Sequence, residues 1–519
     1  MNAPNLGAAS AAPLFIQVVH VPEKTDIVIV GGGTAGWMCA AALAAQGIAK
    51  LCRITLVEGQ ASHPAGAGYT TLPSIKAFHR LLGLDEADLL RQTLATFKLG
   101  TEFSGWSEFQ AAYFHPFGSY GDKAGGLDFL QHWLRARGEG LAQPLEDYSY
   151  CIAASKRNRF DFPTKDPKSI ASTYDYAYHL DADLYKECLK NLAVNCGVIR
   201  LQDWVDDTGR NSVNGNIERL MLKSGKTLKG DFFIDCSGSD AILIGESLGV
   251  GAVDCSHWLP CDRTIAISSS GGGLPPYTRV MAKAAGWQWK IPLQNSSNGY
   301  VYSSGVISDD EAANELHKSL DGNPVSAPLL SSFKSGYRET TWYKNCVAVG
   351  AAGACFDPLE PTGLYLVQAA ITQLIRLFPG EGQGPMPAKE FNRHIEEEYT
   401  RIRDFLILHY HLASRTDSEI WRHCKEMVIP EALEQKITLF KKRGFLDVDA
   451  AGPFPVASWI SVMTGQGIWP ESTNPLRRNF PREELHKTLG GIRGAVNRSV
   501  ENMSSHREFI SQYLSKAAK

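Results

Sequence analysis

The stretch TDIVIVGGGTAG (Thr25–Gly36) decides the fold of this chain. Its first half is mostly apolar and β-branched, which predicts a short buried parallel strand. A glycine turn with the spacing G-x-G-x-x-G follows, and the alanine-rich run WMCAAALAAQ (37–46) predicts a helix. A second apolar run, RITLV (53–57), ends at Glu58. This order of strand, glycine turn, helix, strand and acid is typical of a Rossmann βαβ unit that binds a dinucleotide.

Each small residue of the turn has a part in binding a dinucleotide. Gly31 makes the tight turn, Gly33 lets the backbone approach a pyrophosphate, and Gly36 lets the helix pack closely on the sheet. The helix N-terminus at Thr34 and Ala35 faces the phosphates with unpaired N–H groups. The carboxylate that ends the second strand is placed to accept hydrogen bonds from a ribose, which favours FAD or NAD over NADP. The alternative is a glycine-rich packing turn.

Two distant segments favour FAD over NAD. The run DFFIDCSGSD (231–240) predicts a strand followed by a Ser-Gly turn, and NCVAVGAAGACFDP (345–358) predicts another strand and a turn of small residues. A helix is expected from Gly363 to about Leu377. Flavin monooxygenases build their FAD domain from separated pieces of this kind, and a helix N-terminus stabilises negative charge on the isoalloxazine ring. The alternative is two more buried strands of any α/β sheet.

Composition excludes several classes of function. The chain has 519 residues, 44% hydrophobic and 21% charged, and a net charge of −3, which gives no drive toward nucleic acid or an anionic membrane. No apolar run approaches the ~18 residues of a membrane helix, and the N-terminus does not resemble a signal peptide. The 11 cysteines are scattered without a C-x-x-C pair, so we expect a reduced, cytoplasmic setting and no metal site.

The sequence predicts that the chain is organised in three parts. Residues 1–24 are small and polar and are expected to form a flexible tail. Residues 25–380 are expected to form a discontinuous FAD-binding domain with inserted segments that face the substrate. Residues 381–519 are expected to form a helical C-terminal region that walls the substrate pocket.

The C-terminal region has helical spacing throughout. A helix is predicted over 390–413, two more are predicted on either side of Pro430, and a late helical segment is expected to break at Gly490-Gly491. His409 and His411 are two residues apart and point to different helix faces, so they are poor metal partners. We expect them to have a core or surface role.

A tryptophan motif narrows the chemistry. Trp287, Trp289, Ile291 and Pro292 form the string W-x-W-x-I-P, and its two tryptophans point to the same side of an extended strand. Taken alone, it predicts an aromatic core strand that ends at a proline. Behind a flavin fingerprint, it resembles the signature of flavin-dependent halogenases, the tryptophan halogenase family. In that family this segment lies by the flavin and keeps the organic substrate away from it.

Two further segments extend the resemblance over roughly residues 25 to 470. TFKLG (96–100) matches the segment with the family's essential lysine, which assigns that role to Lys98. DPLEPTGLY (357–365) matches the family's P-L-E-x-T-G segment and gives Glu360 the second active-site position. Without this context, Lys98 would be predicted as solvated surface, and Glu360 as a cap of the helix that follows.

The same match implies contacts with halide and flavin. It gives Thr362 and Gly363 the halide-binding positions, and it places Ala351, Asp357 and Leu364 at the flavin.

FHPFG (114–118) resembles the segment that supplies aromatic walls, so His115 and Phe117 are expected to flank the substrate ring.

Three departures from the family pattern stand out. Where the family has G-E-[AG]-T near the flavin, this chain has Tyr69 and no carboxylate. Pro361 replaces the serine of tryptophan-specific members. The region 448–471 is short and lacks the tyrosine-rich insertion that those members use to hold the amino-acid backbone.

The resemblance implies an α/β fold, with a flavin-monooxygenase-like FAD domain of Rossmann type and an additional, mostly helical substrate-binding region. It implies a flavin-dependent halogenase that uses FADH2, O2 and chloride or bromide, with FADH2 supplied by a separate NAD(P)H-dependent flavin reductase. Hypohalous acid would reach Lys98, as ammonium or free amine, and halogenate an indole-type aromatic substrate. The alternatives are a halogenase of free tryptophan, a flavin-dependent aromatic hydroxylase and a catalytically silent flavoprotein. A homodimer is compatible with the sequence.

Overall fold

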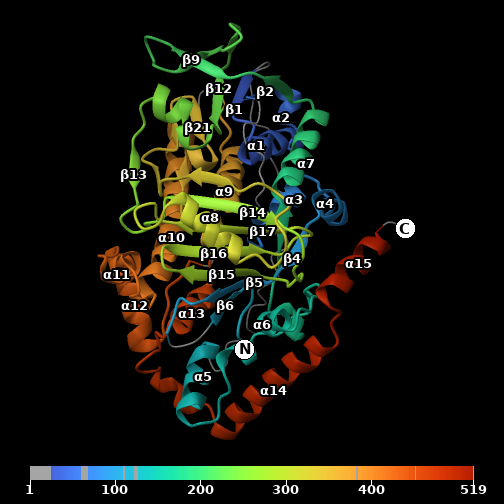
Figure 1. Ribbon diagram of the computed structural model, residues 1–519, viewed down its shortest axis with the longest axis vertical. Helices are drawn as coiled ribbons and strands as arrows, with labels where there is room; N and C mark the ends of the chain where they lie inside the picture. Colours follow the sequence, from blue (N-terminus) through green and yellow to red (C-terminus); the bar gives the residue numbers. More distant parts are fainter. Residues whose placement is uncertain are drawn as a thin grey trace, which may run out of the picture.

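The computed structural model describes residues 25–59, 68–108, 112–121, 127–380, 384–449 and 452–517. The expected N-terminal tail lies outside these residues. The molecule is elongated and has three parts along its long axis (Figure 1). A six-stranded sheet lies at one end, a seven-stranded sheet lies in the middle, and helices fill the other end.

The six-stranded sheet is the predicted Rossmann sheet. Its strands, in spatial order, are β20 (Trp342–Tyr343), β21 (Cys346–Ala348), β12 (Phe232–Asp235), β1 (Asp26–Val30), β2 (Arg53–Glu58) and β8 (Ile199–Gln202). All neighbours are parallel except the β20–β21 pair. The strands β1, β2, β12 and β21 are those that the sequence predicted, so the α/β class is confirmed.

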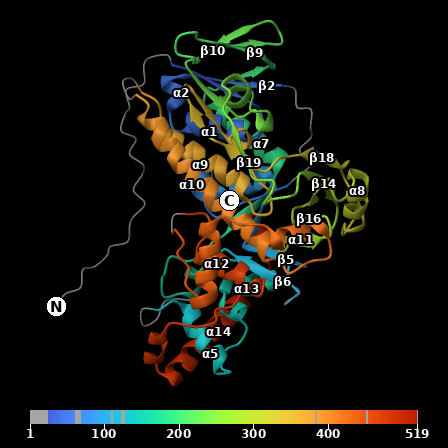
Figure 2. The ribbon, with the colours of Figure 1, turned by 90° about the vertical axis from the view of Figure 1, so that its left-hand side faces the viewer.

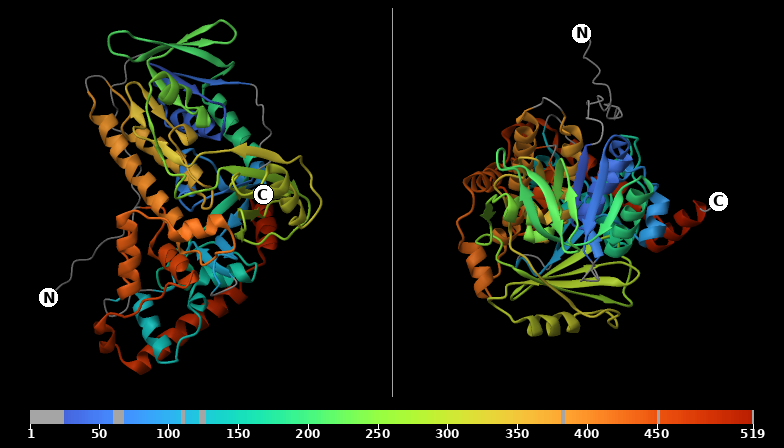
Figure 3. Two further views of the ribbon diagram at one scale, coloured as in Figure 1. Left: turned by 60° about the vertical axis from the view of Figure 1, so that its left-hand side comes forward. Right: turned by 90° about the horizontal axis from the view of Figure 1, so that it is seen from above.

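Helices cover one face of this sheet. The small sheet of β9 (Val205–Arg210), β10 (Ile217–Leu222) and β11 (Thr227–Lys229) packs on the other face, where Val28 and Val30 share a core with Ile217 and Leu220. Helix α1 (Thr34–Ala45) follows the glycine turn and packs against α7 (Ala182–Asn195), and Figure 3 shows both beside the blue strands. Helix α9 (Thr362–Arg376) contacts α1 and lies one residue from the bounds predicted for it.

The glycine turn allows the close contacts for which it was predicted. Gly31 has a φ of +119°, and a Cβ there would lie 2.1 Å from the carbonyl oxygen of Cys236, the residue that follows β12. A Cβ at Gly36 would lie 1.9 Å from the carbonyl oxygen of Gly31. By contrast, a Cβ at Gly33 would meet nothing within 4 Å. Gly31 and Gly36 therefore serve packing, whereas Gly33 borders open space in front of α1.

The seven-stranded sheet contains the tryptophan motif. In spatial order its strands are β18 (Leu329–Ser332), β14 (Arg263–Ser269), β17 (Ser296–Tyr302), β16 (Gly286–Ile291), β15 (Thr278–Lys283), β5 (Gly100–Ser104) and β6 (Ala112–Pro116). Pairing is antiparallel except between β15 and β5. A separate small sheet has the order β3 (Gly68–Thr70), β7 (Ala177–Asp181) and β4 (Thr96–Lys98).

The C-terminal region is helical, as predicted. Its helices are α10 (Met386–Leu412), α11 (Glu419–Glu426), α12 (Glu431–Arg443), α13 (Val456–Gly465), α14 (Arg482–Glu501) and α15 (His506–Lys516). Figure 2 shows α10 running beside α9 and leading into α12 and α13. Within the described residues, no helix is long and apolar enough to cross a membrane.

The break expected at Gly490-Gly491 is wrong, because α14 runs through both glycines. Leu485, Leu489, Val496 and Val500 are buried at helical spacing on either side of them, and this apolar stripe outweighs the ~1 kcal/mol cost of each glycine. The helical segment ends after α14 instead, and the Ser505–Glu508 capping box starts α15.

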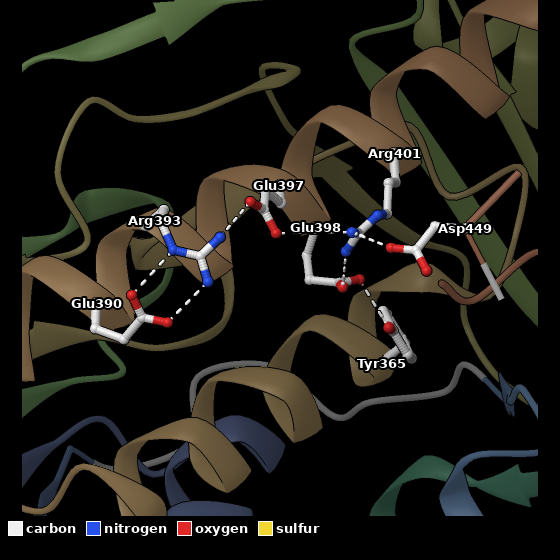
Figure 4. Close-up of polar contacts among 7 residues, drawn as sticks. All are labelled: Tyr365, Glu390, Arg393, Glu397, Glu398, Arg401 and Asp449. Carbon is white, nitrogen blue, oxygen red and sulfur yellow. Dashed lines mark hydrogen bonds and ion pairs between the residues drawn. The ribbon is translucent and has the colours of Figure 1, made fainter. Parts of the chain in front are cut away.

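Helix α10 carries the buried carboxylate of Glu398 among surface ion pairs (Figure 4). Glu398 is 2% exposed and accepts hydrogen bonds from the guanidinium of Arg401 and, at 2.7 Å, from the hydroxyl of Tyr365 on α9. Arg401 also pairs with Asp449. The exposed pair of Arg393 with Glu390 adds little to stability, whereas Glu398 fixes the direction of the Tyr365 side chain.

Alanine substitutions at Gly36 and Gly33 test the account of the glycine turn. We expect Gly36→Ala to lower the free energy of unfolding by about 1–3 kcal/mol, because the new methyl group meets backbone that cannot move aside. Gly33→Ala is the matched control and should leave the FAD-free protein unchanged. Urea denaturation measures both. Equal midpoints for the two variants would contradict the account.

Candidate active site

Lys98 is buried without a partner. It is 0% exposed at the end of β4, and no hydrogen-bond acceptor in the described part of the chain reaches its Nζ atom. Burial lowers the pKa of the Lys98 amine to about 7, although the charge of Glu360 raises it. The amine therefore gains and loses its proton near neutral pH.

The hairpin of β5 and β6 brings the predicted aromatic residues to Lys98. Phe117 donates its backbone N–H to the carbonyl of Leu99 at 2.8 Å, and Lys98 Nζ lies 5.0 Å from the centre of the Phe117 ring. His115 pairs with Thr101 across the hairpin. Alternate residues of a strand share a face, so His115 and Phe117 both point toward the buried side.

Glu360 lies in a network of histidines. Its Oε1 atom lies 2.7 Å from His115 Nδ1 and 3.4 Å from His409 Nε2, while Oε2 has no partner among the described residues. His115 Nε2 in turn lies 2.7 Å from the Ser458 hydroxyl on α13. Burial raises the pKa of Glu360, but His115 and His409 together outweigh it and hold the pKa well below its usual range. The side chain does not cap α9, so the capping alternative is wrong.

Sequence reasoning missed His409 as a member of this network. It was expected in a core or surface role, and it is indeed fully buried. However, its Nδ1 lies 3.2 Å from the Tyr113 hydroxyl, and its Nε2 faces Glu360. The chain crosses about 50 residues between Glu360 and His409, and no local pattern marks the contact. Ser458 was missed for the same reason.

A cavity of about 610 Å³ opens beside these residues. His115, Phe117 and Ser458 form one wall, and Tyr365 on α9 another. Asp175, which also lines the cavity, is already paired with Lys76. No lysine or arginine stands among the described residues that line it.

The tryptophan strand is tied to both sides of the site. Trp287 donates its indole N–H to the Tyr410 hydroxyl at 3.0 Å, and Tyr410 donates to Asp357 at 2.7 Å. Asp357 also accepts the backbone N–H of Leu359 at 3.0 Å, which fixes the turn before Glu360. Burial raises the pKa of the Asp357 carboxyl to about 7, despite these hydrogen bonds.

At its C-terminal end, the tryptophan strand β16 contacts β4, the strand that ends with Lys98. The Thr96 hydroxyl on β4 donates to the carbonyl of Pro292 at 2.8 Å. The Ile291 side chain lies beside Gly68 on β3. The rings of Trp287 and Trp289 lie on one side of β16 with their centres 5.9 Å apart, as predicted.

Helix α9 begins at Thr362, directly after Glu360 and Pro361. No side chain caps its N-terminus, so the N–H groups of Gly363 and Leu364 have no intrahelical acceptor, whereas the N–H of Thr362 donates to the carbonyl of Glu360 at 2.7 Å. Thr362 is buried, whereas Gly363 is exposed and a Cβ there would meet nothing within 4 Å. This helix end provides backbone donors that suit an anion.

The glycine turn, Ala351 and Glu58, which were predicted to bind a dinucleotide, lie together at the end of the molecule that contains the six-stranded sheet. A Cβ at Gly350 would lie 2.8 Å from Ala35 Cβ, so the 3-10 helix η5 (Gly350–Ala352), which contains the exposed Ala351, adjoins the glycine turn. Glu58 accepts the Trp37 indole N–H at 3.2 Å and pairs with Arg200.

Tyr69, where the family motif has a carboxylate, reaches the same turn. Its hydroxyl lies 3.0 Å from the Thr34 hydroxyl. At this position the chain therefore has a neutral hydrogen bond where the family motif has a negatively charged carboxylate.

Comparison with known proteins decides the family. The tryptophan halogenase family model matches residues 26–482. The chain belongs to the tryptophan halogenase family. It is accordingly a flavin-dependent halogenase, an FADH2-dependent enzyme.

Solved and curated relatives agree over nearly the whole chain. BrvH, a flavin-dependent halogenase from Brevundimonas sp. BAL3, is 39% identical with a TM-score of 0.89, covering 94% of this chain and 99% of that one. Xcc4156, a flavin-dependent halogenase from Xanthomonas campestris, is 38% identical with a TM-score of 0.90, covering 94% and 98%. Tryptophan 7-halogenase KtzQ from Kutzneria sp. is 34% identical, covering 94% and 97%.

The lowered pKa of Lys98 predicts a pH dependence of the halogenase's stability. Between pH 7 and about pH 10.5 the unfolded chain holds a proton on Lys98 that the folded chain has lost, so stability should rise with pH across this window. Below pH 7 both states are protonated, and the full cost of the buried charge remains. Lys98→Met should therefore be more stable than wild type at pH 7, with the gap closing toward pH 10. Urea denaturation across this range measures the gap, and a constant difference would contradict a lowered pKa.

Proposed function

We propose that this halogenase uses FADH2, O2 and chloride or bromide to halogenate a neutral, electron-rich aromatic compound of the indole type. Lys98 delivers the halogen, and Glu360 assists it. The observation that carries the proposal is a fully buried lysine amine without an acceptor, placed between the aromatic wall of a cavity and a charged carboxylate.

The glycine turn and η5 suit FAD. The open space in front of Gly33 leaves room for a pyrophosphate at the N-terminus of α1, where Gly31, Thr34, Ala35 and Gly36 form the backbone cradle. Glu58 would hold the ribose, and the backbone at Ala351, Asp357 and Leu364 would face the flavin. Bound reduced FAD and O2 supply the oxidising equivalents that convert halide into hypohalous acid.

The N-terminus of α9 would hold the halide. The N–H of Gly363 and the helix dipole both favour an anion, whereas the N–H of Thr362 already donates to the carbonyl of Glu360 at 2.7 Å, so Thr362 would contribute its side chain. This helix start follows Glu360 closely in the chain. Hypohalous acid formed here would therefore lie next to the network of Glu360, His115 and His409.

The tryptophan strand would separate the flavin from the substrate. Trp287 cannot turn freely, because Tyr410 holds its indole N–H. Trp289, Ile291 and Pro292 continue the barrier to β4. Only small molecules such as hypohalous acid would then pass from the flavin to Lys98.

Lys98 and Glu360 would share the transfer. As an ammonium, Lys98 donates a hydrogen bond to the hypohalous oxygen and polarises the oxygen–halogen bond; as a free amine, it takes the halogen itself. The ring carbon forms the carbon–halogen bond as the halogen's earlier bond breaks. Glu360, kept charged by His115 and His409, accepts the ring proton. On the ammonium route this proton combines with the departing hydroxide as water. On the free-amine route water has already left when the nitrogen–halogen bond forms, and the ring proton returns to the amine nitrogen. Positioning of the ring by His115 and Phe117 sets selectivity.

The charge of the cavity favours a neutral substrate. A carboxylate-bearing substrate such as free tryptophan would need a cation, and the described lining residues offer none. Tyr365 presents its ring, since its hydroxyl is taken by Glu398 (Figure 4).

Three further expectations belong to the proposal. A separate NAD(P)H-dependent flavin reductase supplies FADH2, and the enzyme works in the cytoplasm. Residues 25–380 act as the FAD domain, and residues 381–519 wall the substrate cavity. This division is supported by α13, which packs on β6 and brings Ser458 to His115.

Lys98→Ala tests the delivery step. Halogenated product should fall at least ~100-fold, because no amine receives the oxidant, while FAD binding stays unchanged. Lys442→Ala, which removes an exposed lysine paired with Glu471, is the matched control. Product is measured by mass spectrometry with a flavin reductase, NADH and either halide. Retained halogenation would defeat the role of Lys98, and hydroxylated product in halide-free buffer would favour a hydroxylase.

A substrate panel tests the charge argument. We expect kcat/KM for indole to exceed that for free tryptophan by at least ~10-fold, because burying an unpaired carboxylate costs more than 1.4 kcal/mol. Indole with a methyl group at carbon 3 controls for added size without charge and should stay close to indole. If tryptophan matches both compounds, the neutral-substrate assignment fails.

A further inference from the structure

A second cavity lies next to the catalytic one and is not used by the proposed reaction. It has a volume of about 270 Å³ and shares no lining residue with the 610 Å³ cavity. Its walls come from β6, α13 and α5 (Phe129–Gly138), which lie close together at the helical end of the molecule (Figure 1). Ser458 on α13 lines the catalytic cavity, and Ser461, about one turn later, lines the second.

Five aromatic rings line this second cavity. The rings are those of Tyr113, Phe114, Tyr120, Trp133 and Trp469. Trp133 and Trp469 are stacked with ring centres 5.4 Å apart and an angle of 24° between their planes. Trp133 is held by a hydrogen bond from its indole N–H to the carbonyl of Gln143 at 2.9 Å. These fixed faces suit a flat aromatic ring.

Arg137 supplies a free positive charge at the same cavity. Its guanidinium carbon lies 4.0 Å from the centre of the Trp469 ring, and no hydrogen bond or ion pair engages it within the described ranges. Arg135, on the same helix, differs, because it is held by Glu139 and by backbone carbonyls. A guanidinium stacked on an indole keeps its N–H edge available for a carboxylate.

The acidic residue of the cavity does not oppose an anion. Glu146 lines the cavity, but it is paired with Lys156, so the net charge around Arg137 stays positive. The volume lies just below the ~300 Å³ at which pockets for drug-sized ligands begin, which suits one or two fused rings.

We propose that this cavity is a second ligand site, which binds a small flat aromatic carboxylate. The ring lies against Trp133 and Trp469, and the carboxylate binds the N–H edge of Arg137. The ligand differs from the proposed substrate in its charge, so the two cavities select opposite kinds of aromatic compound. Tyr113 forms a wall of the second cavity, and its hydroxyl contacts His409, so the second site adjoins the Glu360 network.

Equilibrium binding of indole-3-acetate to the full-length, FAD-loaded protein tests the proposal. Calorimetry gives the Kd, and quenching of tryptophan fluorescence reports contact with the indole walls. We expect Arg137→Gln to weaken binding about 10- to 100-fold, as the loss of a charged hydrogen-bonded pair predicts. Lys436→Gln is the matched control, since Lys436 also lies over an indole, that of Trp459 at 4.3 Å, but does not line the cavity.

Two further binding measurements distinguish this second site from the catalytic cavity. Binding should persist in Phe117→Ala and in the presence of saturating indole, because neither reaches the second cavity. It should also persist in Lys98→Ala, so a failure of the halogen-delivery proposal would leave this result intact. Absence of binding to wild type, equal binding to Arg137→Gln, or displacement by indole would overturn the second site.

Discussion

The buried charge of Glu360 is the constraint on which the rest of the active site depends. A carboxylate removed from water is costly unless other groups stabilise it, and His115 and His409 do so from two different elements. Those elements, β6 and α10, must therefore meet at the start of α9. Ser458 on α13 fixes His115 from its other nitrogen, so the helical region contributes to the geometry of the candidate site and does not only cover it.

The same carboxylate also influences the protonation state of Lys98. Burial favours the neutral amine and Glu360 favours the ammonium, and the balance leaves the pKa of Lys98 near neutrality. A lysine in water would stay charged, and a lysine buried without a carboxylate nearby would stay neutral. The pair gives access to both forms near neutral pH, which suits the proposed role of Lys98 in binding an oxidant and then releasing it.

The tryptophan strand acts as a brace, in addition to the role of barrier that we propose for it. It holds the turn before Glu360 through Tyr410 and Asp357, and it holds the strand of Lys98 through the carbonyl of Pro292. The two reactive side chains are thus positioned by one strand of the central sheet. This arrangement explains why a motif with no reactive group of its own accompanies the lysine and glutamate segments.

The sequence by itself determined the Rossmann unit, the flavin family and the helices, because these depend on local periodicity, on glycine geometry and on short motifs. It also marked Lys98 and Glu360 through their neighbours in the chain. It misplaced the break of α14, since Gly490-Gly491 weakens a helix locally, whereas the buried stripe of Leu485 and Val496 maintains it. Only the tertiary structure decided the partners of Glu360, the brace from Trp287 to Asp357 and the cation beside Trp469. These contacts join residues that are far apart in the chain, and hydrogen bonds and desolvation act over distances in space that sequence spacing does not encode.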